Sequence, residues 1–196
     1  EGDRVQWVRQ CTAQDDVVIG TKNGYATRFK ANDEQLRTTG RTSQGVRSIN
    51  LRKGDVPVDM DIIPNQEEEE GQMLLAVTSG GYGKRVAVGE FHAQNRGGKG
   101  VIAIKFRDGR NEGAHVEKLC CLRVVKEADE VVLSTRSGNI VRQRADQISL
   151  QSRSATGVII QKLDQKDEII NIAVAHLVKG KKVEEQLGVE DIVYLP

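Results

Sequence analysis

Arginine and lysine side chains recur at a fixed place in three similar stretches of this chain. Each stretch is a short apolar run followed by Thr, a glycine turn and an arginine. A second basic residue stands within two positions of each arginine, and the pairs are Arg28 with Lys30, Lys84 with Arg85, and Arg142 with Arg144. Cations that recur once per structural unit would line up as a stripe. Such a stripe suits duplex DNA, which carries a phosphate about every 1.7 Å of helix axis.

A glycine-rich loop is the second feature that could hold phosphate. Residues Gln94–Gly100 have the sequence Gln-Asn-Arg-Gly-Gly-Lys-Gly, in which two adjacent glycines stand between Arg96 and Lys99. Adjacent glycines let a backbone come close to an anion and turn N–H groups toward it. The loop is not a P-loop, because Val101 stands where Ser or Thr would have to follow the Gly-Lys pair. We interpret it as a phosphate contact, with a loop that merely permits a turn as the alternative.

The similarity extends over whole units. Thr21, Thr78 and Thr135 are 57 positions apart, and each is followed by a basic residue that precedes a Gly-Val pair. A further apolar run closes each unit. The spacing predicts one domain, 1–196, with repeat units at about 17–63, 74–125 and 131–175, the end of a preceding blade at 1–16 and a C-terminal tail at 176–196.

The periodicity within a unit is that of β-strands. The apolar runs are short and bounded by glycine turns, and Asn-Gly or Ser-Gly pairs after the first run predict two-residue hairpins. Ile102, Ile104 and Phe106 alternate with other residues, as in a strand with one exposed face. Four short strands per unit, repeated radially, predict an all-β, propeller-like fold in a partial arc of about three blades. A short helix at 181–187 is the one helical element that we expect.

Composition and the lack of known motifs argue against several classes of function. Basic and acidic residues nearly balance, 29 against 28, so their local distribution must decide whether nucleic acid is bound. No apolar run is long enough to span a membrane. His92, His115 and His176 lack zinc-site spacing, and Cys120 with Cys121 predicts buried thiols in a reducing compartment. No hydrolase or nucleotide-binding motif is present, so we expect no catalytic site, metal or cofactor on this chain.

Alternatives stay open at this point. Repeats duplicate surface residues as well as core residues, so the recurring arginines could simply solvate a repeated strand. A propeller that binds protein partners would share the fold, although it has no reason to keep both the recurring arginines and the Gly-Gly-Lys-Gly loop. The acidic run Glu67–Glu70 is predicted to belong to a solvated insertion, 64–71, with an acidic regulatory patch as the alternative.

Several stretches resemble the C-terminal domain of the DNA gyrase A subunit, and less closely that of topoisomerase IV. They are NGYATRF, GGYGKRVAVGEF, QNRGGKGVIAIKF, SGNIVRQRADQISLQSRSATGVIIQKL and DEIINIAV. The resemblance implies a β-pinwheel, a six-bladed propeller-like ring whose basic rim wraps double-stranded DNA. It implies as partners the gyrase B subunit, together with the N-terminal core of the A subunit, in an A2B2 complex, a type IIA topoisomerase with ATP-dependent negative supercoiling. The implied location is the bacterial cytoplasm, or a chloroplast or mitochondrion, with no membrane partner.

The resemblance is to the later blades of that ring. Gln94–Gly100 is similar to the family's gyrase A box, Gln-Arg-Arg-Gly-Gly-Lys-Gly, with Asn95 in place of an arginine. The box lies in the first blade, whereas the flanks of this loop are similar to the fifth. Three units are fewer than six, so we expect an incomplete pinwheel with exposed ends, or ends completed by another copy. The residues predicted to contact DNA are Arg28, Lys30, Arg41, Arg47, Lys84, Arg85, Arg96, Gly97, Gly98, Lys99, Arg142, Arg144 and Arg153.

Overall fold

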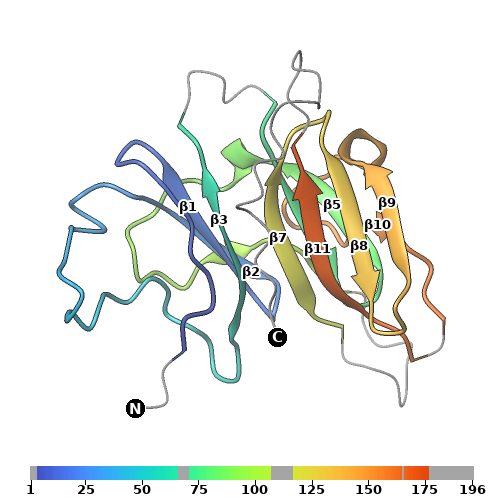
Figure 1. Cartoon of the computed structure of the whole chain (residues 1–196), viewed down its shortest axis with the longest axis horizontal. Coiled ribbons are helices and arrows are strands. Elements are labelled where there is room, and N and C mark those ends of the chain that lie inside the picture. Colours follow the sequence, from blue (N-terminus) through green and yellow to red (C-terminus); the bar gives the residue numbers. More distant parts are fainter. Residues whose placement is uncertain (1–3, 66–70, 107–116, 165, 177–196) are drawn as a thin grey trace, which may run out of the picture.

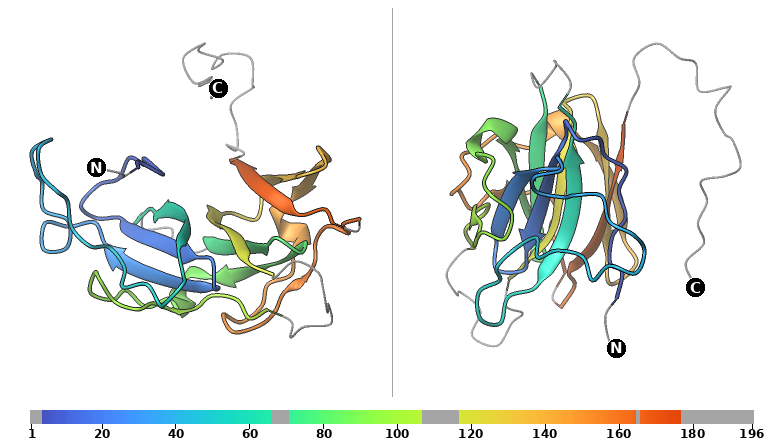
Figure 2. Two further views of the ribbon diagram at one scale, coloured as in Figure 1. Left: turned by 90° about the horizontal axis from the view of Figure 1, so that it is seen from below. Right: turned by 90° about the vertical axis from the view of Figure 1, so that its left-hand side faces the viewer.

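The chain folds into three small antiparallel sheets that stand side by side in a partial arc (Figure 1 and Figure 2). The computed structural model describes residues 4–65, 71–106, 117–164 and 166–176. Among these residues every regular element is a strand, apart from two single turns of 3-10 helix, η1 (Val88–Glu90) and η2 (Ala145–Gln147). The all-β prediction is therefore confirmed. The predicted helix at 181–187 and the acidic run at 67–70 lie outside the described residues.

Each repeat unit supplies three strands to a sheet in the same order. The first strand of the unit lies in the middle and pairs antiparallel with the second and the third. In the first sheet this middle strand is buried along its whole length, as its continuous apolar run predicts. The strands are β1 (Asp16–Thr21), β2 (Tyr25–Lys30) and β3 (Pro57–Ile63); β4 (Met73–Thr78), β5 (Tyr82–Ala87) and β7 (Leu119–Val125); and β8 (Glu130–Thr135), β9 (Ile140–Arg144) and β11 (Ile169–Ala175).

A fourth strand reaches the first two sheets from the following unit. Strand β6 (Val101–Ile102) belongs to the second unit, yet it pairs with β2 of the first, with Ala26 opposite Val101. Strand β10 (Val158–Ile159) belongs to the third unit and pairs with β5 in the same way. The expectation of four strands within each unit is thus corrected, because a unit keeps three strands and contributes its fourth to the sheet before it. The third sheet has three strands among the described residues.

The contributed strand comes so close to its host sheet that glycine is required where it begins. Gly100 has a φ of +69°, and a Cβ atom there would lie 2.6 Å from the carbonyl oxygen of Ala26. Gly157 has a φ of +83°, and its Cβ would lie 2.9 Å from the carbonyl oxygen of Gly83. Side chains of other residues tolerate neither this backbone conformation nor this contact. The Gly-Val pairs at Gly100 and Gly157 are therefore the points at which one unit crosses to its neighbour.

Apolar side chains pack between adjacent sheets. One cluster is shared by the first two sheets and includes Val18 and Leu74, and another is shared by the second and third and includes Leu75 and Leu133. Each such fully buried side chain stabilises the fold by about 1.5–3 kcal/mol. Ile104 lies two residues after the contributed strand β6 and belongs to the first cluster. Strand exchange and core packing are therefore coupled.

A comparison of Gly100→Ala with Gly45→Ala tests the close approach. Both glycines have positive φ, but no heavy atom lies within 4 Å of the Cβ position at Gly45. Both variants incur the left-handed strain of about 1–2 kcal/mol. We expect Gly100→Ala to lose at least about 2 kcal/mol more, because its methyl group must push β6 away from Ala26. Urea unfolding of dilute protein measures the free energy of unfolding of each variant. Equal losses of stability in the two variants would contradict the close approach of β6 to Ala26.

Candidate nucleic-acid interface

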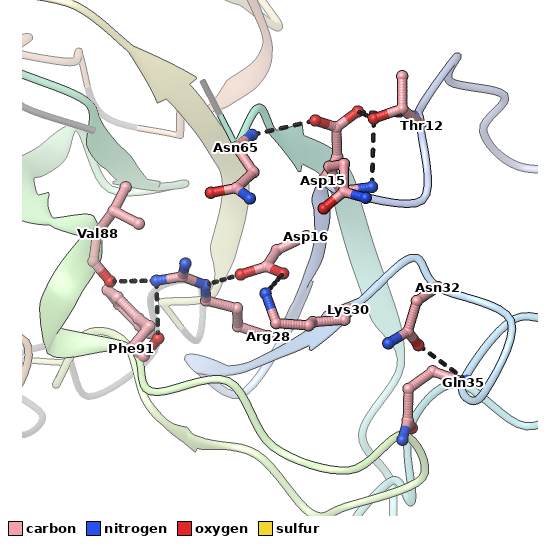
Figure 3. Close-up of polar contacts among 11 residues, drawn as sticks. Thr12, Asp15, Asp16, Arg28, Lys30, Asn32, Gln35, Asn65, Val88 and Phe91 are labelled. Atoms are coloured by element: carbon pink, nitrogen blue, oxygen red, sulfur yellow. Dashed lines mark hydrogen bonds and ion pairs between the residues drawn. The ribbon is translucent and has the colours of Figure 1, made fainter. Parts of the chain in front are cut away.

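The first recurring arginine joins two sheets. Arg28 lies on β2, and its Nε atom is 2.6 Å from Asp16 Oδ2 on the neighbouring strand (Figure 3). Its Nη1 atom donates to the carbonyl oxygens of Val88 at 3.2 Å and Phe91 at 3.3 Å, which belong to the second unit. The side chain is 12% exposed. Charge-assisted hydrogen bonds of this kind fix the position of η1 against the first sheet.

The second recurring arginine repeats this contact one unit later. Arg85 on β5 donates from Nε to the carbonyl oxygen of Ile148 at 2.7 Å, and from Nη2 to that of Asp146 at 3.2 Å. Its side chain is 7% exposed. Arg28 and Arg85 therefore add little exposed charge to the expected stripe. Both guanidinium groups bind protein carbonyl groups around the next 3-10 turn.

Lys84 is the most buried of the predicted DNA-contact residues. Its side chain has no exposed surface, and its Nζ atom donates to the carbonyl oxygens of Ser152 at 2.8 Å, Arg153 at 2.6 Å and Ala155 at 2.9 Å. Burial lowers the pKa of Lys84 to about 8, and the charge of Glu90 opposes the shift. Lys84 therefore holds the third unit's loop onto the second sheet and adds no exposed charge to the expected stripe.

The candidates on the outer edge are exposed, but each lies beside a carboxylate. Their side chains are 52% exposed for Lys30, 67% for Arg142 and 57% for Arg144. A neighbouring carboxylate reduces the attraction of such a cation for phosphate. Arg153 is half-buried and donates to the carbonyl oxygen of Ile102. The ion pairs are Lys30 with Asp16 at 3.5 Å, Arg142 with Glu130, and Arg144 with Asp146 at 2.5 Å.

The remaining candidates lie on two loops that touch each other. The glycine-rich loop 94–100 of the second unit lies against residues 47–52 of the first. The N–H group of Gly97 donates to Ser48 O at 2.9 Å, and the N–H group of Asn50 donates to Gly98 O at 2.9 Å. The Gly97 N–H group thus faces protein, where the sequence favoured a phosphate. These backbone bonds hold the two loops in one surface.

Two guanidinium groups fasten the loops further. Arg96 donates from Nη1 to the carbonyl oxygen of Arg47 at 2.6 Å. Arg52 donates to the carbonyl oxygen of Lys99, and its guanidinium carbon lies 3.4 Å from the centroid of the Tyr25 ring. A cation over an aromatic face is attracted by the ring quadrupole, so Arg52 is held on both sides. The contacts use the backbone of Arg47 and Lys99 and leave their side chains available.

Positive charge on these loops is not balanced locally. Residues 36–54 and 94–100 contain no Asp or Glu. Arg41, Arg47 and Lys99 are exposed, and within the described part of the chain none of them is in an ion pair. We call this region the basic loop surface, and its members are Arg37, Arg41, Arg47, Arg52, Lys53, Arg96 and Lys99.

Four residues of this region were not predicted from the sequence. Arg37, Arg52 and Lys53 belong to a segment rich in basic residues and free of acidic ones, so composition could have identified them. Gln35 gave no signal. It accepts the Arg96 N–H group on Oε1 at 2.7 Å and the Arg96 Nε–H group on its carbonyl oxygen at 2.6 Å, across 61 residues of sequence.

The described residues give little support for thiol chemistry or metal binding. Burial raises the pKa of Cys120 to about 12 and holds the pKa of Cys121 well above its ordinary value, so both are neutral thiols, as predicted for small apolar side chains. His176 Nδ1 lies 2.8 Å from Asp129 Oδ2, and His115 lies outside the described residues. The described residues contain no group of three or more His, Cys, Asp or Glu able to hold a metal ion. Nor do they include a helix long and apolar enough to cross a membrane.

Strand exchange between propeller-like sheets, with a basic surface on the connecting loops, defines a class of repeat domain. The family model described as DNA gyrase C-terminal domain, beta-propeller, matches residues 15–64, 72–112 and 129–176. This chain belongs to that family, and the predicted family and fold are confirmed.

Curated relatives and solved structures agree with the family. The DNA gyrase A subunit of Synechocystis sp. is 40% identical over 200 residues, which cover 88% of this chain and 23% of that protein. The DNA gyrase A subunit of Staphylococcus epidermidis is 35% identical over 175 residues, with coverages of 88% and 18%. A solved gyrase A C-terminal domain has a TM-score of 0.68 at 27% identity, over 82% of this chain and 50% of that one. A topoisomerase IV C-terminal domain shares the fold, with a TM-score of 0.72 at 20% identity, over 83% and 47%.

Replacing Lys84 by Met tests its structural role. Three carbonyl oxygens lose a buried donor, so we expect the free energy of unfolding to fall by about 3 kcal/mol. Lys30→Met is the matched control, because that side chain is half exposed, on the equivalent strand, and should change stability by less than about 0.5 kcal/mol. Thermal and urea unfolding of both variants give the comparison. Similar values for the two variants would mean that the Lys84 contacts do not stabilise the fold.

Proposed function

We propose that the basic loop surface binds the phosphate backbone of duplex DNA without reading its base sequence. The observation that carries the proposal is the uninterrupted positive charge of two loops that backbone hydrogen bonds hold together. Phosphate contacts of Lys and Arg supply most of the affinity in sequence-independent binding. The Tyr25 ring, which contacts this surface, has the Arg52 guanidinium group over its face, so stacking of splayed bases has little support.

The proposal is narrower than a stripe along the whole rim. Arg28, Lys84 and Arg85 bind carbonyl groups of neighbouring units. Because these side chains are buried, they are poorly placed to contact DNA phosphates. Lys30, Arg142 and Arg144 are exposed beside carboxylates and are assigned a minor part. Arg41, Arg47, Arg96, Gly97, Gly98 and Lys99 stay among the proposed contact residues, and Arg37, Arg52 and Lys53 join them.

Membership of the gyrase A C-terminal family supports a larger role, which is also a proposal. The chain spans about a quarter or less of the curated gyrase A relatives and about half of the solved C-terminal domains. We propose that it acts as the later part of a gyrase A subunit, where it bends or wraps DNA for an ATP-dependent type IIA topoisomerase in the cytoplasm. In this role its partners are double-stranded DNA, the gyrase B subunit, and the N-terminal core of the A subunit. The chemical steps belong to those other parts.

Titration of a fluorescent random duplex of about 40 base pairs tests the binding site. Removing two phosphate contacts with Arg47→Ala plus Lys99→Ala should weaken binding at least about tenfold, and should reduce the slope of log K against log salt by about 2. Both substitutions leave the backbone contacts of the loops in place.

Arg142→Ala plus Arg144→Ala is the matched control, because it removes the same formal charge from an exposed strand. We expect its affinity to stay within about twofold of the parent. An equal loss in both double variants would show that charge, and not the loop surface, decides binding. No binding at all near 50 mM salt would reject DNA binding and favour a protein-interaction module.

A further inference from the structure

Two loops precede the contributed strands β6 and β10, and each is held by the unit before it. The N–H group of Arg96 donates to Oε1 of Gln35 at 2.7 Å. The N–H group of Arg153, 57 positions later, donates to Oε2 of Glu90 at 2.7 Å. Each arginine also donates from Nη1 to a carbonyl oxygen of the preceding unit at 2.6 Å. The two loops therefore have equivalent side-chain anchors, but one anchor is a neutral amide and the other is a carboxylate.

In the loop before β10, residues 151–157, the charge of the anchor is compensated by a buried lysine. Lys84 donates from Nζ to the carbonyl oxygens of three residues of this loop, at 2.8, 2.6 and 2.9 Å. Burial lowers the pKa of Lys84, and the negative charge of Glu90 opposes that shift. The ammonium group and the carboxylate therefore hold the same loop while their charges offset each other.

Neither charge has a counterpart at the loop before β6, residues 94–100. Thr27 stands 57 positions before Lys84 and is buried as well, but it brings no charge to the loop. Its hydroxyl group has no hydrogen-bond partner among the described residues. The anchor of this loop is the neutral amide of Gln35. The residues that hold the loop therefore leave its positive charge uncompensated.

A tight turn fixes the position of Gln35 beside the loop. Its N–H group donates to the carbonyl oxygen of Asn32 at 3.1 Å and to Oδ1 of Asn32 at 3.2 Å (Figure 3). Asp33 and Glu34 precede it and are exposed, and their carboxylates form no hydrogen bond or ion pair within the described part of the chain. The side chain of this turn that contacts the loop is thus the neutral one.

We propose that Gln35 is a specificity-determining residue, which keeps loop 94–100 available for DNA phosphates. The amide anchors this loop without adding negative charge. At loop 151–157, Glu90 and Lys84 offset each other, and the loop serves as a structural contact between units. A carboxylate at position 35 would accept the same N–H group but would compete with phosphate for the cations of the loop. The inference rests on the proposed function, because it identifies what makes one loop, and not the other, part of the DNA-binding surface.

Titration of the fluorescent random duplex of about 40 base pairs with Gln35→Glu, in the whole chain, tests the inference. We expect the dissociation constant near 50 mM salt to rise at least about fivefold, and the slope of log K against log salt to fall by about 1. Gln147→Glu is the matched control, because it adds the same charge to an exposed residue of η2 in the third unit. Its affinity should stay within about twofold of the parent.

A double variant separates local charge from net charge. Gln35→Glu plus Glu90→Gln has the formal net charge of the parent and keeps a side-chain acceptor at both anchors. We expect it to bind at least about threefold more weakly than the parent, because the added carboxylate still lies beside loop 94–100. Recovery of the parent affinity would overturn the inference, since it would show that net charge alone decides binding.

Gln35→Met separates the charge of the anchor from its hydrogen bond. This variant removes the acceptor without adding charge, so it should leave the slope of log K against log salt unchanged. An equal fall of the slope in Gln35→Met and Gln35→Glu would contradict the inference, and so would equal losses of affinity in Gln35→Glu and Gln147→Glu. These outcomes leave the proposed function intact. A parent chain that does not bind DNA would reject the proposed function and this inference with it.

Discussion

The crossing of each unit into the sheet of the unit before it is the constraint on which this structure depends. A three-stranded sheet exposes a row of unpaired N–H and C=O groups at its edge. In the first two sheets the next unit covers that edge, and the segment that covers the first one leads Ile104 into the core that both sheets share. Adjacent sheets therefore cannot separate without losing hydrogen bonds and apolar contacts together. The left-handed glycines at the crossing points are conditions of this packing, not incidental turns.

The same constraint explains why basic residues recur at the repeat spacing. Arg28 and Arg85, which are 57 positions apart, each bind the carbonyl groups around the following 3-10 turn. A side chain that is needed wherever one unit crosses to the next will recur at each crossing point, whatever the domain binds. The positive charge of the proposed DNA interface is instead the charge that does not repeat. It is concentrated in residues 37–53 of the first unit and in the glycine-rich loop that lies against them.

Much of the fold could be predicted from the sequence because short apolar runs and glycine turns are local signals. An apolar run is expected to close the units at about residues 63, 125 and 175, and the third strands, at 57–63, 119–125 and 169–175, end at those residues. The sheet with which each fourth strand pairs could not be predicted. A Gly-Val pair has the same sequence pattern whether its strand joins the sheet of its own unit or that of the unit before it. The inward orientation of the Lys84 side chain could not be predicted either, because its three carbonyl partners lie 68 to 71 residues away in the sequence. The glycine-rich loop was found from its residues, but its partner segment depends on a contact between units.

We propose that residues 37–53 and 94–100, and not the recurring arginines, contact DNA. Hydrogen–deuterium exchange of the chain with and without a duplex of about 40 base pairs, which is long enough for several phosphate contacts, measures this directly. The account predicts that DNA at low salt slows exchange in those two segments and leaves residues 140–144 unchanged. Protection confined to residues 140–144, with the two loops exchanging as fast as in free protein, would contradict it.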